Sequence, residues 1–100
     1  MSDGDKVFVD KMVSLFMELT PELMNRLNLA IESMDYKEIK LTAHKMISSI
    51  DMMGIDSLKQ IVRSLESMAS QKADMAEIKL SADFLEKTLL TVMDQIRGSN

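Results

Sequence analysis

The stretch YKEIKLTAHKMISSIDMMG, residues 36–54, decides the fold, because its pattern predicts one amphipathic helix that the final glycine ends. Residues placed at about 100° per position gather an apolar stripe on one face. That stripe comprises Tyr36, Ile39, Ala43, Met46 and Ile50, with Met53 at its margin. His44, the single histidine of the chain, lies roughly 120° from the centre of the stripe. The pattern therefore predicts an imidazole that stands in solvent at the middle of the helix.

The helix face around His44 is polar and mostly basic. It carries Lys37, Lys40, Leu41, Ser48 and Asp51, with Lys45 beside the histidine and Ile47 between this face and the core side. A lone histidine on a helix is most often a surface residue without chemistry. Here, however, neighbouring lysines can offset negative charge that arrives at the ring. An imidazole is also a competent nucleophile toward phosphorus and, with an ordinary pKa of ~6.5, is mostly neutral at cellular pH. His44 is therefore the candidate reactive group, with an inert surface histidine as the alternative.

Composition excludes several functional classes. The 100 residues suffice for one small domain, and the absence of cysteine excludes disulfides, thiol redox chemistry and zinc–thiolate sites. A net charge of −4 without a basic block argues against nucleic-acid binding. The carboxylates are scattered and form no convergent set for a metal. No apolar run approaches the ~20 residues that span a bilayer, and MSDGDK lacks the core of a signal peptide. We expect a cytoplasmic domain, free-standing or part of a larger protein, with no membrane contact and no metal or cofactor of its own.

The segment before residue 36 predicts two helices. The first covers about residues 5–19. Thr20 is a good N-cap and Pro21 suits a first helical position, so a second helix is expected over about residues 20–34. The predicted apolar faces are Phe8, Met12, Leu15, Phe16 and Leu19 in the first helix, and Leu23, Leu27, Ala30, Ile31 and Met34 in the second.

Capping signals define the other helices. Asp35 with Glu38 forms a capping-box pattern at the start of the helix over residues 36–53. A helix over about 56–69 follows Gly54, and Asp74 opens the last one, over about 74–97. The apolar residues of this last helix repeat in steps of three and four, a pattern typical of both a bundle core and a dimer seam. We favour the core, and so expect a monomer. The expected fold is all-α: one domain, residues 1–100, with an antiparallel four-helix bundle and an additional short N-terminal helix.

Residues 15–66 resemble the histidine phosphotransfer (HPt) domain of bacterial phosphorelays. The matching features are the LF-x-E start, the T-P-E-L opening at Thr20, the D-Y-x-x-I lead-in at Asp35 and the block from Ala-His at 43–44 to Gly54. A leucine-spaced helix that ends in Leu65 and Glu66 follows them. No single feature is decisive, but their order and spacing together are specific.

The resemblance implies a function. His44 would take a phosphoryl group from the aspartyl phosphate of a response-regulator receiver domain, such as that of a hybrid sensor histidine kinase, and pass it to another receiver. Domains of this family bind no ATP and do not phosphorylate themselves, and the Mg²⁺ ion of the reaction belongs to the receiver. The surrounding contact surface would be the polar face of the helix that carries His44: Lys37, Lys40, Leu41, Lys45, Ile47, Ser48 and Asp51.

The chain departs from the family at two positions. The family usually has lysine three residues after the histidine and glycine one residue later, where this chain has Ile47 and Ser48. Lys40 and Lys45 are the candidates to replace the missing charge.

Two alternatives stay open. One is a docking module that binds receivers without efficient transfer. The other is the helix pair of a sensor kinase, which expects an acidic residue after the histidine, where Lys45 stands here, and two long helices only.

Overall fold

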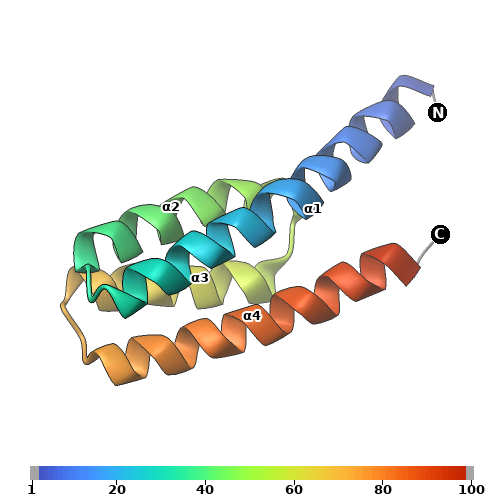
Figure 1. The fold of residues 1–100 in the computed structure, drawn as a ribbon. Coiled ribbons are helices and arrows are strands. Elements are labelled where there is room, and N and C mark those ends of the chain that lie inside the picture. The colour runs from blue at the N-terminus through green and yellow to red at the C-terminus, as the bar shows by residue number, and fades with distance from the viewer. Residues whose placement is uncertain (1–2, 99–100) are drawn as a thin grey trace.

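The computed structural model describes residues 3–98 of the chain, with side chains described over residues 6–98, and the fold is all-α as predicted (Figure 1). Its helices are α1 (Asp3–Glu32), α2 (Tyr36–Met53), α3 (Asp56–Ser70) and α4 (Met75–Gly98). α2 has the predicted bounds, and α3 and α4 begin or end within one residue of theirs. Short turns connect consecutive helices, which therefore run antiparallel.

The prediction of two helices before residue 36 is wrong. Asp3–Glu32 form one helix with Pro21 in its interior, so within residues 3–98 the bundle has four helices and no separate N-terminal one. Thr20 does not cap a helix: its side chain is buried, and its Oγ1 lies 3.5 Å from Oγ of Ser49 on α2. A proline inside a helix removes one backbone hydrogen bond and crowds the preceding turn. Burial of the face that continues on both sides of Pro21 offsets this cost.

The buried face of α1 explains its continuity. Phe16, Thr20, Met24 and Leu27 follow one another in steps of four, four and three, and all are buried. They form a single stripe that crosses Pro21 without a change of phase. The stripe is hard to recognise in the sequence because Thr20, a residue type typical of caps, occupies one of its central positions.

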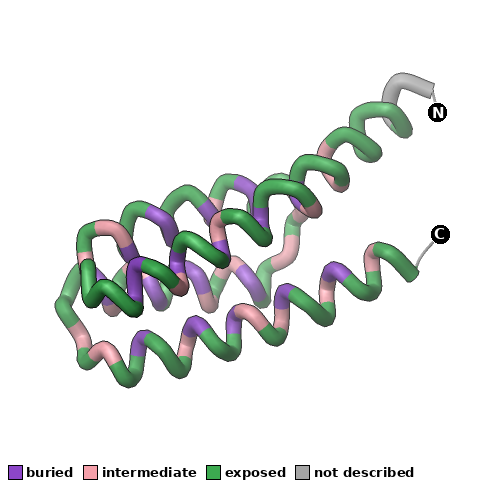
Figure 2. Tube along the Cα trace, viewed as in Figure 1, coloured by how far each residue is buried: buried purple, intermediate pink, exposed green. Residues whose placement is uncertain are grey.

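The N-terminal part of α1 projects beyond the ends of α2 and α3 (Figures 1 and 2). Of the apolar face predicted there, only Phe16 is buried; Phe8 is 64% exposed, and Leu15 and Leu19 are exposed as well. Met34, predicted to be buried, lies beyond the end of α1 in a left-handed conformation and is also exposed. The NH groups of Met34 and Asp35 bond to carbonyls of the last turn of α1, so this residue serves to end the helix.

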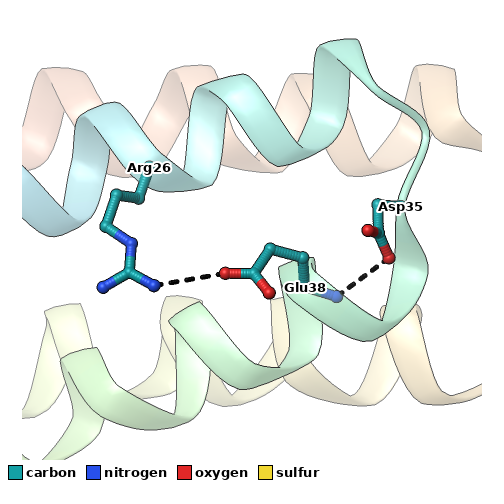
Figure 3. Close-up of polar contacts among 3 residues, drawn as sticks. All are labelled: Arg26, Asp35 and Glu38. Atoms are coloured by element: carbon teal, nitrogen blue, oxygen red, sulfur yellow. Dashed lines mark hydrogen bonds and ion pairs between the residues drawn. The ribbon is translucent and has the colours of Figure 1, made fainter.

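The start of α2 is fixed by side-chain contacts (Figure 3). Asp35 is its N-cap, and the backbone NH of Glu38 donates to the Asp35 carboxylate at 3.1 Å, as the capping-box pattern predicts. The Glu38 carboxylate in turn accepts from Arg26 of α1 at 3.2 Å. At the other end, Gly54 has a φ of 65° and its NH bonds to the carbonyl of Asp51. Both ends of the helix that carries His44 are therefore fixed by capping hydrogen bonds from neighbouring residues.

The four helices enclose one core. α2 packs against α1 and α3, and α4 packs against the same two helices from the other side, so α2 and α4 lie diagonally opposite, with no Cα atoms of the described residues within 8 Å of each other. The inward faces are buried along the bundle (Figure 2). The seam of α4 lies inside, as predicted. Its buried residues are Ile78, Ala82, Leu85, Leu89 and Met93.

Candidate functional site

His44 lies on the outer face of α2 with 69% of its side chain exposed. Its Nδ1 atom lies 2.9 Å from Oε2 of Glu66 on α3, whose side chain is 25% exposed. An ionised carboxylate can only accept a hydrogen bond, so Nδ1 carries the proton in this contact and the neutral ring has its lone pair on Nε2. The neighbouring helix thereby selects one tautomer. The ring nitrogen that remains free is the nucleophilic one.

The register between α2 and α3 places these two residues side by side. His44 and Glu66 are equally far along the chain from Ile55, which lies between the two helices. Asp51 and Lys59 are also equally far from Ile55, and they form an ion pair. Both contacts, His44–Glu66 and Asp51–Lys59, are centred on Ile55. In this antiparallel hairpin, residues that are equally far from the turn therefore lie side by side.

Two surface hollows meet at the histidine. Lys37, Lys40, Leu41 and Glu66 surround it in one of them. The second hollow has further residues from both helices: it is lined by Lys40, His44, Ile47, Arg63, Glu66, Ser67 and Ser70. Four of the predicted contact residues, Lys37, Lys40, Leu41 and Ile47, are therefore gathered around the imidazole by the fold.

The other predicted contact residues do not line these hollows. Lys45 and Ser48 are exposed on α2 outside both hollows, and Asp51 is engaged by Lys59 closer to the α2–α3 turn. They belong to a wider surface of α2. The residues in immediate reach of the ring come instead from α2 and α3 together.

Sequence reasoning missed the contribution of α3 to the site. The sequence marks Glu66 only as the end of the family-like segment and indicates no role for Arg63, Ser67 or Ser70. A usable signal existed, because these residues flank the apolar stripe of α3 at helical spacing. Counting outward from the turn at Gly54 would have placed Glu66 opposite His44.

A comparison with protein-family models identifies the family of the chain. Residues 11–99 match the family described as Hpt domain, and the chain belongs to that family. It therefore has a histidine phosphotransfer role in phosphorelays and interacts with receiver domains of response regulators. A search of curated proteins found no match, and neither did a search of solved structures. Within residues 3–98, none of the helices has the length and apolar character that crossing a membrane requires.

Proposed function

We propose that His44 is the phosphoryl-accepting residue of this domain and that it relays the group between two receiver domains in the cytoplasm. The observation that carries the proposal is the contact between Nδ1 of His44 and the Glu66 carboxylate, on a ring that is otherwise open to solvent. The chain has no other histidine. A phosphoryl-transfer partner can approach the free nitrogen without any movement of the bundle.

The transfer follows from this geometry. The Nε2 lone pair attacks the phosphorus of the receiver's aspartyl phosphate. The N–P bond forms as the P–O bond to the aspartate breaks, and the aspartate leaves as a carboxylate. The ring becomes positively charged, and its Nδ1–H group remains bonded to Glu66, whose negative charge stabilises that state. Attack by the aspartate of a second receiver reverses these bond changes and returns the neutral imidazole.

The partner provides what this chain lacks. We expect the Mg²⁺ ion to be bound by the receiver, and we expect this chain to act without a cofactor of its own. The contribution of the bundle is to hold the imidazole rigidly and in one tautomer, which lowers the cost of orienting the two reacting groups. Lys37 and Lys40, which lie beside the ring, favour the approach of an anionic donor.

A panel of phosphorylated receivers from the source organism tests the proposal. We expect transfer of the phosphoryl group to the parent chain and none to His44→Gln. Because the side chain is exposed, the variant should keep the parent's helical content and melting temperature. Acid-labile phosphoryl uptake that survives in His44→Gln would overturn the assignment.

The alternative is a docking module that binds receivers without efficient transfer, and the observation in its favour is the apolar Ile47 beside the ring. It predicts a receiver complex with no uptake of phosphoryl groups by either chain. Measuring binding and transfer on the same receivers separates the two functions.

A further inference from the structure

We infer that Arg63, a residue of α3, is a cation that contacts the phosphoryl group on His44 from the position across the hairpin from Ile47. The inference rests on the proposed function of His44. It assigns a role to a residue on a different helix from the histidine, at a position that the pattern around His44 does not mark.

The position of Arg63 supports this role. Arg63 lines the same hollow as His44, Ile47 and Lys40. The α2–α3 hairpin fixes its height: Arg63 lies between Lys59, which pairs with Asp51, and Glu66, which contacts His44. Ile47 and Arg63 are equally far from Ile55 along the chain. Arg63 is therefore positioned opposite Ile47, in the hollow that holds the histidine.

Arg63 is also available to bind a new anion. Two charged neighbours of Arg63 on α3 are already engaged: Lys59 is paired with Asp51, and Glu66 holds the imidazole. Arg63 is exposed, and within residues 6–98 its side chain takes part in no recorded ion pair or hydrogen bond. It can turn toward a new anion without giving up an existing partner.

The guanidinium group of Arg63 also matches a phosphoryl group in charge and geometry. A phosphoryl group on Nε2 brings up to two negative charges to a surface hollow that also holds Lys40. A guanidinium presents a planar set of NH donors that matches phosphoryl oxygens, and it stays charged at all relevant pH values. With Lys40 from α2 and Arg63 from α3, the phosphoryl group would have a cation on each side. The positive charge that the family usually has at the position of Ile47 would then come from Arg63, on the other helix of the hairpin.

The experiment uses the full chain and phosphoramidate, a small donor that needs no receiver. Its P–N bond breaks, ammonia leaves, and the phosphoryl group is transferred to the imidazole. The rate of labelling and the lifetime of the phosphohistidine are followed by phosphorus NMR for the parent, Arg63→Gln and Arg63→Lys. Arg97→Gln is the matched control. It makes the same change of charge at an exposed residue of α4, the helix that lies diagonally opposite α2.

We expect Arg63→Gln to slow labelling or shorten the lifetime by about two- to five-fold, with an effect that shrinks at higher salt. Arg63→Lys should lie between Arg63→Gln and the parent, and Arg97→Gln should match the parent. The decisive variant is the double change Ile47→Lys with Arg63→Gln. It returns a cation to the site from α2, and we expect it to recover most of the loss.

The outcomes separate the inference from the function on which it rests. If the parent is labelled at His44 but Arg63→Gln behaves like Arg97→Gln, Arg63 has no role and the proposed function stands. A loss that Ile47→Lys fails to recover also overturns the role as a phosphoryl contact. If phosphoramidate does not label the parent, the same variants are compared with a phosphorylated receiver as the donor; no label on His44 from either donor overturns both the inference and the proposed function. Circular dichroism of each variant checks that the helices are intact.

Discussion

Nδ1 of His44 and Oε2 of Glu66 lie 2.9 Å apart, so a carboxylate on α3 determines which nitrogen of the imidazole on α2 carries the proton. This contact crosses between two helices and joins a 69% exposed side chain to one that is 25% exposed. The more buried member is the carboxylate. The ring is thus oriented by the less exposed of the two groups.

Replacement of Glu66 should slow transfer without unfolding the bundle. Glu66→Ala removes the acceptor for Nδ1–H, and we expect a decrease of about three- to ten-fold in the transfer rate, the range of a partly exposed hydrogen bond. Glu66→Gln keeps an acceptor oxygen and should have a smaller effect. Rates from a single phosphorylated receiver give the comparison. Glu86→Ala is the control, since Glu86 accepts from Asn28 far from the hollows; equal rates in Glu66→Ala and Glu86→Ala would contradict the orienting role.

The charges on α2 should act at close range and weakly. A cation beside a phosphorylated imidazole at a partly exposed site contributes about 0.5–1 kcal/mol. Ile47→Lys should therefore lengthen the phosphohistidine lifetime or speed its formation by a few-fold, and Lys40→Ala should do the opposite. Both effects should shrink between low and moderate salt. A Lys40→Ala variant that behaves as the parent, together with loss of receiver binding in Ile47→Lys, would make Ile47 an apolar docking contact.

The interior position of Pro21 can be tested through stability. In a continuous helix, Pro21→Ala restores a backbone NH and relieves the contact with the preceding turn, worth about 3 kcal/mol. Greater freedom of the unfolded chain offsets up to about 1 kcal/mol of this. We expect a higher free energy of unfolding in urea and a higher melting temperature. If Pro21 instead began a separate helix, the substitution would leave stability nearly unchanged.

The protein should be a monomer in solution, because the apolar seam of α4 is buried inside the bundle. Light scattering over a range of concentrations is the direct measurement. A stable dimer at all concentrations would contradict the prediction. Phe8→Ser would then locate the contact, since Phe8 is among the exposed apolar residues of the projecting part of α1; a dimer that this variant abolishes forms through that segment.

Capping residues close to its ends predict α2 well, whereas features of α1 that depend on contacts between helices cannot be predicted from the sequence. Asp35 and Gly54 act within a few residues of the helix ends, so the bounds of α2 follow from the sequence. The predicted helix start at Thr20 is wrong for a physical reason. A threonine before a proline is typical of a helix start, and only the contact with Ser49 on α2 shows that Thr20 is a buried residue inside a helix. The apolar residues of the first turns of α1 predicted burial, but whether other helices extend far enough to cover them is a tertiary property.

The site was predictable on α2 only. The exposure of His44 follows from helical phase, and Lys40 and Ile47 follow with it. Glu66 and Arg63 belong to another helix, and their nearness to His44 depends on the antiparallel register set by the turn at Gly54 and Ile55. Sequence periodicity describes each helix separately, so it does not contain this pairing.

The hairpin of α2 and α3 has a consequence for how the protein folds. The histidine, its carboxylate partner and the flanking cations all lie on two consecutive helices joined by a very short turn. Contacts of such low sequence separation need little loop closure and form early in the folding of small helical domains. The register that brings Glu66 to His44 can therefore be set before α4 docks. On this basis, substitutions that weaken the α1–α4 side of the bundle should accelerate unfolding more than they slow folding.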